Sequence, residues 1–280
     1  FFSHFKLIMS ESLDRNIKFW EPPSKIDLND LDNSKFWIDL EEWLPHVKVL
    51  EIMGGEPFYM KEFRKLIDKL VDMGVSKNIM VTLSTNGTHY NDTLIDKIVG
   101  NFENLGFNIS LDGVGDKFDY LRHGDNWESN VSGNLDKFYK LHTENDHVNI
   151  NITHTVSVWN FFYLREFHLY FETHYPEFMI WNNTVHFPEW CEANVVPNTS
   201  KNLIIDKVCN PEKYGLPAWS KEKYDKDIKP LVEHTATESK EEHWHKFIEQ
   251  VNAGDIYRKE SFSNTFSELY DILKSDMAVA

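Results

Sequence analysis

The stretch VKVLEIMGGEPFYM, residues 47–60, decides how the rest of the chain is interpreted. Its first seven residues, 47–53, are mostly apolar and predict a β-strand. The Gly-Gly-Glu-Pro sequence at 54–57 ends that strand, because proline disfavours helix at the residue before it and fixes an extended turn. Residues 61–74 then place apolar side chains on one helical face and stop at a glycine. The stretch therefore predicts a strand, a turn and a helix in succession.

The same unit recurs along the middle of the chain. Further strands are predicted at 78–87, 107–113, 147–158 and 178–187, and helices at 92–102, 126–144 and 161–174. Units of roughly 30 residues imply parallel strands joined by right-handed crossovers. The fold class is therefore α/β, either a doubly wound sheet or a (β/α) barrel. In both architectures a ligand lies at the carboxyl ends of the strands.

The strand–helix rhythm stops after Pro188. We therefore expect one domain at 1–188 and a C-terminal helical extension at 189–280. Within the extension, 191–220 is predicted to be mostly loop with one short strand or helix. Two further helices are expected at 241–255 and 265–275.

Composition narrows the function classes. The 280 residues carry 45 acidic and 29 basic side chains, for a formal net charge of −16. This balance argues against binding to nucleic acid or to an anionic membrane, which needs a basic face. No apolar run approaches the ~20 residues that span a bilayer. Two cysteines exclude a disulfide scaffold, so a reducing cytoplasm is the expected location.

The turn after the first predicted strand is a candidate binding corner. Gly54 and Gly55 leave their carbonyls free to point towards the strand ends, and Glu56 adds a carboxylate. These groups are all acceptors, so together they suit an ammonium group. The alternative is a tight turn without a ligand.

Other polar residues follow the later strands. Ser110 and Asp112 end the strand at 107–113 and suit a ribose diol, although a turn before the next glycine is equally compatible. Asn86 either lines the same cleft or caps the following helix. Arg122 either clamps a ligand carboxylate or forms a surface ion pair.

Several of these stretches, taken in order, resemble the radical S-adenosylmethionine (SAM) superfamily. They are MGGEP at 53–57, STNG at 84–87, ISLDGVGDKFDYLRHGDNW at 109–127 and HTVSVWNFFYL at 154–164. They are most similar to twitch domain-containing radical SAM proteins, whose closing helices the stretch HKFIEQVNAGDIYRKESFSNTFSELYDIL at 245–273 also resembles. The resemblance runs from about residue 36 to residue 274.

The resemblance implies a partial (β/α)6 TIM-like barrel that holds S-adenosylmethionine and a 4Fe–4S cluster. In such proteins the reduced cluster cleaves S-adenosylmethionine to a 5′-deoxyadenosyl radical. A flavodoxin or ferredoxin would supply the electron, and the substrate would be an unidentified small molecule or peptide. The resemblance places Gly54, Gly55 and Glu56 at the methionyl ammonium, Ser110 and Asp112 near the ribose, and Thr155 and Ser157 beside the nucleoside. The implied cofactor-binding residues are Gly54, Gly55, Glu56, Pro57, Asn86, Ser110, Asp112, Thr155 and Ser157.

The sequence departs from the family at the cluster ligands. The family holds its cluster with three cysteines in a C-x3-C-x2-C loop before the glycine turn, and residues 1–50 contain no cysteine. The first barrel strand has one weak candidate, FSHFKLIMS at 2–10. We therefore expect the first strand and the cluster loop to be missing, which leaves the edge of 47–53 unpaired.

Two explanations for this departure stay open. The chain is either a truncated piece of a radical SAM enzyme, or a degenerate module that binds a nucleoside or peptide in the same cleft without radical chemistry. Nothing in the sequence supplies metal ligands. Cys191 and Cys209 are too few for an auxiliary cluster, and His243 and His245 point to opposite faces of a helix. Most aromatic residues are expected in the core, and Trp181 and Trp190 are the candidates for the border of a substrate cavity.

Overall fold

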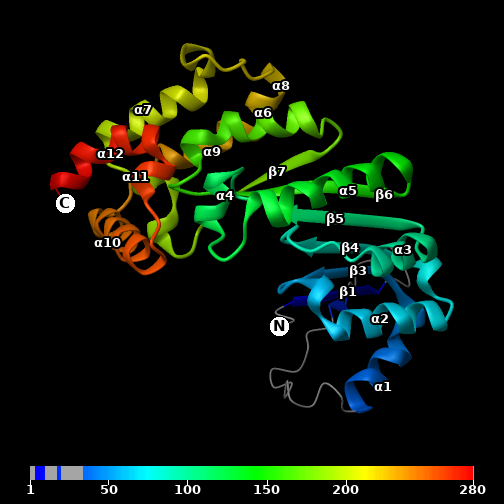
Figure 1. The fold of residues 1–280 in the computed structure, drawn as a ribbon. Helices are drawn as coiled ribbons and strands as arrows, with labels where there is room; N and C mark the ends of the chain where they lie inside the picture. Colours follow the sequence, from blue (N-terminus) through cyan, green and yellow to red (C-terminus); the bar gives the residue numbers. More distant parts are fainter. Residues whose placement is uncertain (1–3, 10–17, 20–33, 280) are drawn as a thin grey trace. The chain divides into compact units, whose positions relative to one another are not determined.

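The computed structural model describes residues 4–9, 18–19 and 34–279 (Figure 1). The chain divides into two compact units. The N-terminal unit comprises Phe1–Ser110 and Asn130–Asn151, and the C-terminal unit comprises Leu111–Ser129 and Ile152–Ala280. The expected domain boundary after Pro188 stays a prediction.

The N-terminal unit is built on a sheet. Its strands are β1 (His4–Met9), β2 (Lys18–Phe19), β3 (Val47–Met53), β4 (Met80–Thr85), β5 (Asn104–Ser110) and the first residues of β6 (Val148–Val156). Their hydrogen-bonded order is β2-β1-β3-β4-β5-β6. The pairs β3–β4 and β4–β5 are parallel, and Figure 1 shows these three strands side by side. This unit therefore has the parallel strands that the sequence predicts.

Helices cover one face of this sheet. They are α1 (Ser34–Trp43), α2 (Lys61–Asp72), α3 (Asp92–Asn101) and α5 (Ser132–Glu144). Phe138 of α5 packs on Phe107 of β5, with ring centroids 5.6 Å apart, and both side chains are fully buried. Burying a side chain of this size stabilises a fold by about 1.5–3 kcal/mol. The apolar faces predicted for the strands and helices thus meet in one core.

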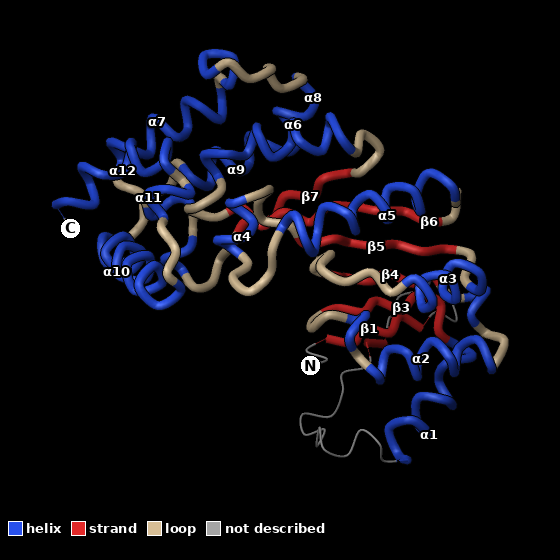
Figure 2. The backbone as a smooth tube through the Cα atoms, in the orientation of Figure 1, coloured by secondary structure: helices blue, strands red, loops and turns tan. Residues whose placement is uncertain are grey.

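The C-terminal unit contains the end of β6, the strand β7 (Met179–Thr184) and most of the helices. These are α4 (Asp116–Leu121), α6 (Leu164–His174), α7 (Asn198–Cys209), α8 (Lys221–Lys223), α9 (Lys229–Thr235), α10 (Glu241–Arg258), α11 (Phe262–Thr265) and α12 (Ser267–Val279). From α7 to α12 the chain is helix and loop only, as Figure 2 shows. Aromatic contacts such as Tyr120–Phe266 and Trp244–Phe247 form its core. The expected α/β class with a C-terminal helical extension is confirmed.

The structure corrects the expectation at the edge of the parallel strands. Residues 4–9 do form a strand, and β1 runs antiparallel to β3, from His4 opposite Met53 to Met9 opposite Val47. The expected unpaired edge of 47–53 is therefore wrong. A barrel strand in this place would run parallel to its neighbour, so β1 is a different element. In the region expected to be mostly loop with one short strand or helix, the structure has the helix α7, of 12 residues.

Candidate functional site

One face of the sheet in the N-terminal unit is polar. On β4 and β5 buried residues alternate with more exposed ones, as the pleat requires, and the half-exposed positions include Thr82, Ser84, Asn108 and Ser110. The register aligns the polar positions of neighbouring strands, with Glu51 opposite Thr82 and Ser84 opposite Asn108. The Asn151 side-chain amide on β6 donates to Asn108 Oδ1 at 3.1 Å. Parallel strands thus present a continuous row of hydroxyl, amide and carboxyl groups.

A glycine lies in this face and keeps it open. Gly106 is opposite Thr82, and a Cβ atom added to it would lie 3.3 Å from Thr82 Oγ1. Ser110 ends the same strand. Of this polar row, the sequence analysis named only Ser110. The signal for the others is the alternation in VTLS, FNIS and INIT, where each second residue is polar or small.

The predicted binding corner lies at the end of β3. Gly54 and Gly55 have φ angles of 85° and 65°, a left-handed conformation that glycine adopts without steric cost. Pro57 is buried and begins a short 3-10 helix, Pro57–Tyr59. The chain therefore turns sharply after the strand, as the sequence predicts.

Glu56 ties this corner to the end of β4. Its carboxylate accepts hydrogen bonds from the Thr85 hydroxyl at 2.9 Å, from the Asn86 backbone N–H at 2.8 Å and from the Phe58 backbone N–H at 3.3 Å. The Asn86 side chain accepts from the Thr88 N–H and hydroxyl, so it closes a local turn. The structure thus brings Glu56 and Asn86 together, through hydrogen bonds within the protein.

Asp112 is the centre of a second polar cluster, in the C-terminal unit. Arg122 donates from Nε at 3.1 Å and from a terminal nitrogen at 2.6 Å, both to Asp112 Oδ2. The Thr155 backbone N–H donates to Asp112 Oδ1 at 3.0 Å. Of the two roles that the sequence allows for Arg122, a clamp on a ligand carboxylate or an ion pair, the structure shows an ion pair, with Asp112.

Asn160 connects the remaining predicted residues to this cluster. Its side-chain amide donates to the carbonyls of Asp112 and Thr155, at 3.0 and 2.9 Å. Its Oδ1 accepts from the Ser157 N–H at 2.7 Å. The structure therefore joins Asp112, Thr155 and Ser157 in one network. The sequence analysis did not name Asn160, which lies only three residues beyond Ser157.

A cavity of about 320 Å³ lies beside Asp112 within the C-terminal unit. The ring of His154 is fully buried, and its Nδ1 lies 3.0 Å from the Leu111 carbonyl, to which it donates. Its Nε2 has no hydrogen-bond partner among the described residues. Burial lowers the pKa of His154, so this ring is neutral.

Charged side chains also border this cavity. Burial lowers the pKa of Lys117, whose ammonium lies 4.3 Å from the centroid of the Tyr163 ring. Glu166 is ion-paired with Lys207 through Oε1, while its Oε2 meets no donor within the described part of the chain. The cavity therefore offers the Lys117 amine, the Glu166 carboxylate and the neutral His154 imidazole to a small polar ligand.

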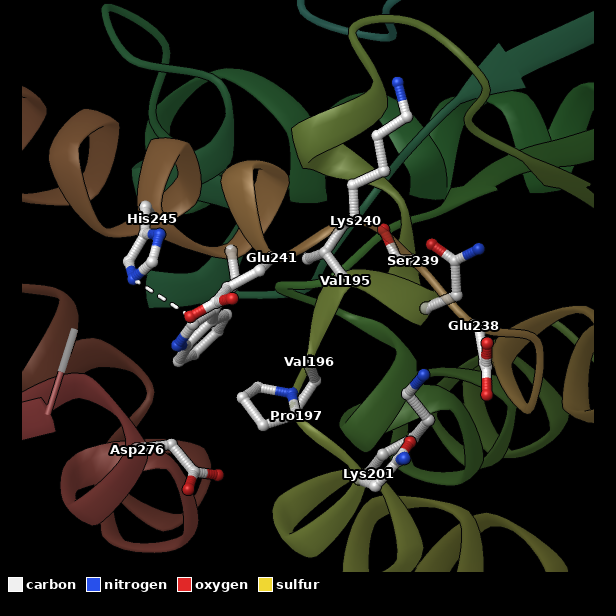
Figure 3. A pocket seen from close by; sticks show the side chains of 13 residues that line it. Val195, Val196, Pro197, Lys201, Glu238, Ser239, Lys240, Glu241, His245 and Asp276 are labelled. Atoms are coloured by element: carbon white, nitrogen blue, oxygen red, sulfur yellow. Dashed lines mark ion pairs between the residues drawn. The ribbon is translucent and has the colours of Figure 1, made fainter.

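A second cavity in the same unit, of about 450 Å³, contains none of the predicted site residues. Figure 3 shows its side chains, which include Lys201, Lys240, Glu238, Glu241 and Asp276. Glu241 and His245 form the ion pair drawn there, at 4.0 Å. With charges of both signs in its wall, this cavity favours neither anions nor cations.

The two cysteines do not fit a 4Fe–4S cluster, which needs several thiolates. Burial raises the pKa of Cys191 to about 12, so it stays a thiol at neutral pH. Cys209 Sγ accepts a hydrogen bond from the Tyr224 hydroxyl at 3.4 Å. The side chains of His243 and His245 contact acidic residues on their own helix. Trp181 borders a further cavity, of about 620 Å³, and Trp190 packs against Trp159.

None of the described helices is both long enough and apolar enough to cross a lipid bilayer.

No family model matches the sequence, and no curated protein matches it. Solved structures do match. The chain is similar to the structure described as "Native anSMEcpe with bound AdoMet and Cp18Cys peptide", at 17% identity and a TM-score of 0.41, over 63% of this chain and 51% of that one.

Two further structures have comparable scores. "Native anSMEcpe with bound AdoMet" matches at 15% identity and a TM-score of 0.43, over 71% of this chain and 57% of that one. "Native anSMEcpe with bound AdoMet and Kp18Cys peptide" matches at 14% identity and a TM-score of 0.42, over 86% and 88%. This chain thus spans little more than half the length of the first two. Likeness at this level says nothing of what this chain binds.

Proposed function

We propose that this chain is the S-adenosylmethionine-binding part of a radical SAM protein, with its closing helices as a twitch-like extension. The observation that carries the proposal is the polar row on β3, β4, β5 and β6, next to the glycine corner after β3. Both features lie in the N-terminal unit, on strands that run parallel. The ordered motifs that resemble the superfamily fall on the same strand ends.

The chemistry of the ligand matches that of the row. S-adenosylmethionine has a ribose and an adenine that need hydrogen-bond donors and acceptors, which Ser84, Asn108 and Asn151 provide. Its sulfonium and ammonium groups are cationic, and Glu51 adds a carboxylate to the row. The left-handed glycines at 54 and 55 let the amino-acid end approach the backbone closely. In this arrangement Glu56 is a positioning residue that holds the corner.

When bound, a reduced 4Fe–4S cluster supplies the electron that cleaves S-adenosylmethionine in this superfamily. The residues of this chain do not fit that cluster, because its two cysteines are too few and Cys191 is a thiol. We therefore assign no radical step to these 280 residues. Their proposed role is to bind and orient the nucleoside.

Equilibrium dialysis with labelled S-adenosylmethionine tests the proposal. We expect the Asn108→Ala variant to bind about tenfold more weakly, the value of one hydrogen bond to the ligand. Asn104→Ala is the matched control, because Asn104 is exposed at the opposite end of the same strand. Equal affinity of Asn108→Ala and wild type, or equal losses in both variants, would contradict the proposed site. Thermal unfolding checks that both variants keep the fold.

The second candidate is a module that binds a nucleoside or a peptide without radical chemistry. The observation in its favour is the pair of cysteines, neither of which suits a cluster. We expect the chain, reconstituted anaerobically with iron and sulfide, to form no 5′-deoxyadenosine above a protein-free control. Chromatographic detection of the product in the presence of dithionite is the measurement. Turnover would exclude this second candidate and would show that the cluster has other ligands.

A further inference from the structure

A group of three potential metal ligands lies in the C-terminal unit, apart from the residues discussed above. His186 follows β7 by two residues, Glu192 lies between two short 3-10 helices (Glu189–Cys191 and Ala193–Val195), and His234 is in the last turn of α9. One ligand atom of each lies within 4.8 Å of those of the other two. We propose that these three side chains bind a divalent transition-metal ion of the zinc class.

The distances suit a shared ion. His234 Nε2 and Glu192 Oε2 are 3.1 Å apart. Two ligands on one tetrahedral zinc, each with a bond of about 2.1 Å, are themselves about 3.4 Å apart. This edge of the site therefore already has the required length. His186 has to approach by at most about 1.5 Å, and because its side chain is exposed, a rotation achieves this.

The directions of the groups also point to an ion. Although Glu192 Oε2 is 3.1 Å away, His234 Nε2 is buried and has no hydrogen-bond partner in the part of the chain the structure describes. The two atoms are close but are not aligned as donor and acceptor. The rings of His186 and His234 are perpendicular, with centroids 5.5 Å apart. Imidazole and carboxylate atoms that lie close together without hydrogen-bonding one another are typical of ligands around a metal.

Backbone hydrogen bonds hold the segments that carry the ligands. The residue before His186 donates its N–H to the Val156 carbonyl at 3.0 Å. The Glu192 carbonyl accepts from the Val195 N–H at 3.3 Å. The His234 carbonyl accepts from the Thr237 backbone N–H at 3.1 Å and also from the Thr237 hydroxyl at 2.7 Å. The site is therefore largely preorganised, which is what metal binding by a small ligand set needs.

The ligand set decides the class of ion. Two imidazoles and one carboxylate are borderline ligands, which suit zinc, iron and similar divalent ions better than calcium or magnesium. Three protein ligands leave a fourth position for water or for another ligand. The net charge of −16 adds a general attraction for cations. No sequence signal indicates this site, because the three residues are separated by 5 and 41 others and form no motif.

The test uses the purified chain after removal of metals with a chelator. We expect Co²⁺ to bind with a stoichiometry of one and to produce visible d–d absorption, which Zn²⁺ then abolishes by displacement. His186→Ala should weaken Co²⁺ binding at least tenfold, and because His186 is exposed the fold should be kept. Glu192→Gln should weaken it similarly. Circular dichroism confirms that the variants remain folded.

Two controls separate this site from other sources of binding. His245→Ala changes an exposed histidine outside the group and should leave Co²⁺ affinity unchanged. Cys191→Ser should also leave the Co²⁺ affinity unchanged. The spectrum of the wild type with Co²⁺ should show no thiolate-to-cobalt charge-transfer band. The proposal is overturned if the wild type binds no Co²⁺, if His186→Ala binds like the wild type, or if His245→Ala loses as much affinity as His186→Ala. None of these readouts depends on the proposed binding of S-adenosylmethionine.

Discussion

Acidification from about pH 7 to about pH 5 will lower the free energy of unfolding, because two fully buried histidines stay neutral in the fold. His154 and His168 are both 0% exposed. Burial lowers the pKa of His154. Burial also lowers the pKa of His168 well below its usual value, and the nearby charge of Lys223 adds to that effect. In the unfolded chain both rings titrate near pH 6.5.

The sign follows from the protons that each state binds. Below about pH 6.5 the two histidines are protonated in the unfolded chain but stay neutral in the folded protein. The free energy of unfolding therefore falls as the pH falls. The full free energy of unfolding is present above that pH. Each histidine costs at most about 1.4 kcal/mol per pH unit within this window. Glu172 affects the pH dependence only below this window. Its pKa is lowered, so the stability that its carboxylate contributes is lost when the carboxylate is protonated.

Urea unfolding at several pH values measures this effect. We expect His168→Gln to flatten the dependence of stability on pH, whatever it does to stability at neutral pH. His245→Gln is the matched control, since that histidine is exposed and should leave the slope unchanged. A slope in His168→Gln as steep as in the wild type would contradict the assignment.

The second large effect is expected from Glu56→Ala, with a loss of about 2 kcal/mol in the free energy of unfolding. The carboxylate accepts hydrogen bonds from Thr85, Asn86 and Phe58, and its removal leaves the Asn86 N–H without this acceptor. Hydrogen bonds to a charged group stabilise by about 1.5–3 kcal/mol each, and partial exposure of Glu56 reduces that value. Glu56→Gln should lose less, since its amide keeps one acceptor oxygen.

Hydrogen exchange locates the effect within the fold. The Asn86 amide should exchange faster in Glu56→Ala than in wild type, because its acceptor is gone. Glu103→Ala is the control, an exposed carboxylate just before β5 whose loss should change stability by less than about 0.5 kcal/mol. If Glu56→Ala unfolds like Glu103→Ala, the carboxylate does not hold the two strand ends together.

The regular elements could be predicted because their patterns are long. The strand at 47–53 has the predicted limits, because its apolar run is unbroken up to the glycines. The helix predicted at 61–74 ends only two residues earlier, because its apolar residues recur with helical spacing. β1 was the failure. Six residues show that a strand is possible, but its direction depends on a partner more than 35 residues away. The helix α4 was missed because its six residues are too few to show a helical period.

The candidate site shows a different limit. The sequence predicts Glu56 and Asp112 as acceptors for a ligand, and in the structure both accept hydrogen bonds from within the protein. The sequence could not identify their donors, because Thr85 lies 29 residues from Glu56 and Thr155 lies 43 residues from Asp112. A carboxylate reserved for a ligand and one that holds two loops together have the same local sequence. Only the tertiary structure distinguishes them.

The antiparallel pairing of β1 with β3 also affects the time course of folding. Met9 faces Val47 and His4 faces Met53, so β1 joins residues 38 to 49 positions apart, the separations of the paired residues. During synthesis at about 5–20 residues per second, β1 is made some 2 to 8 s before the first of its partners in β3. For that interval the edge of β1 that pairs with β3 has no partner from β3, and β2 can pair only with Ile8 and Met9. Pairings of such long range also slow folding itself, because a large loop has to close before any contact forms.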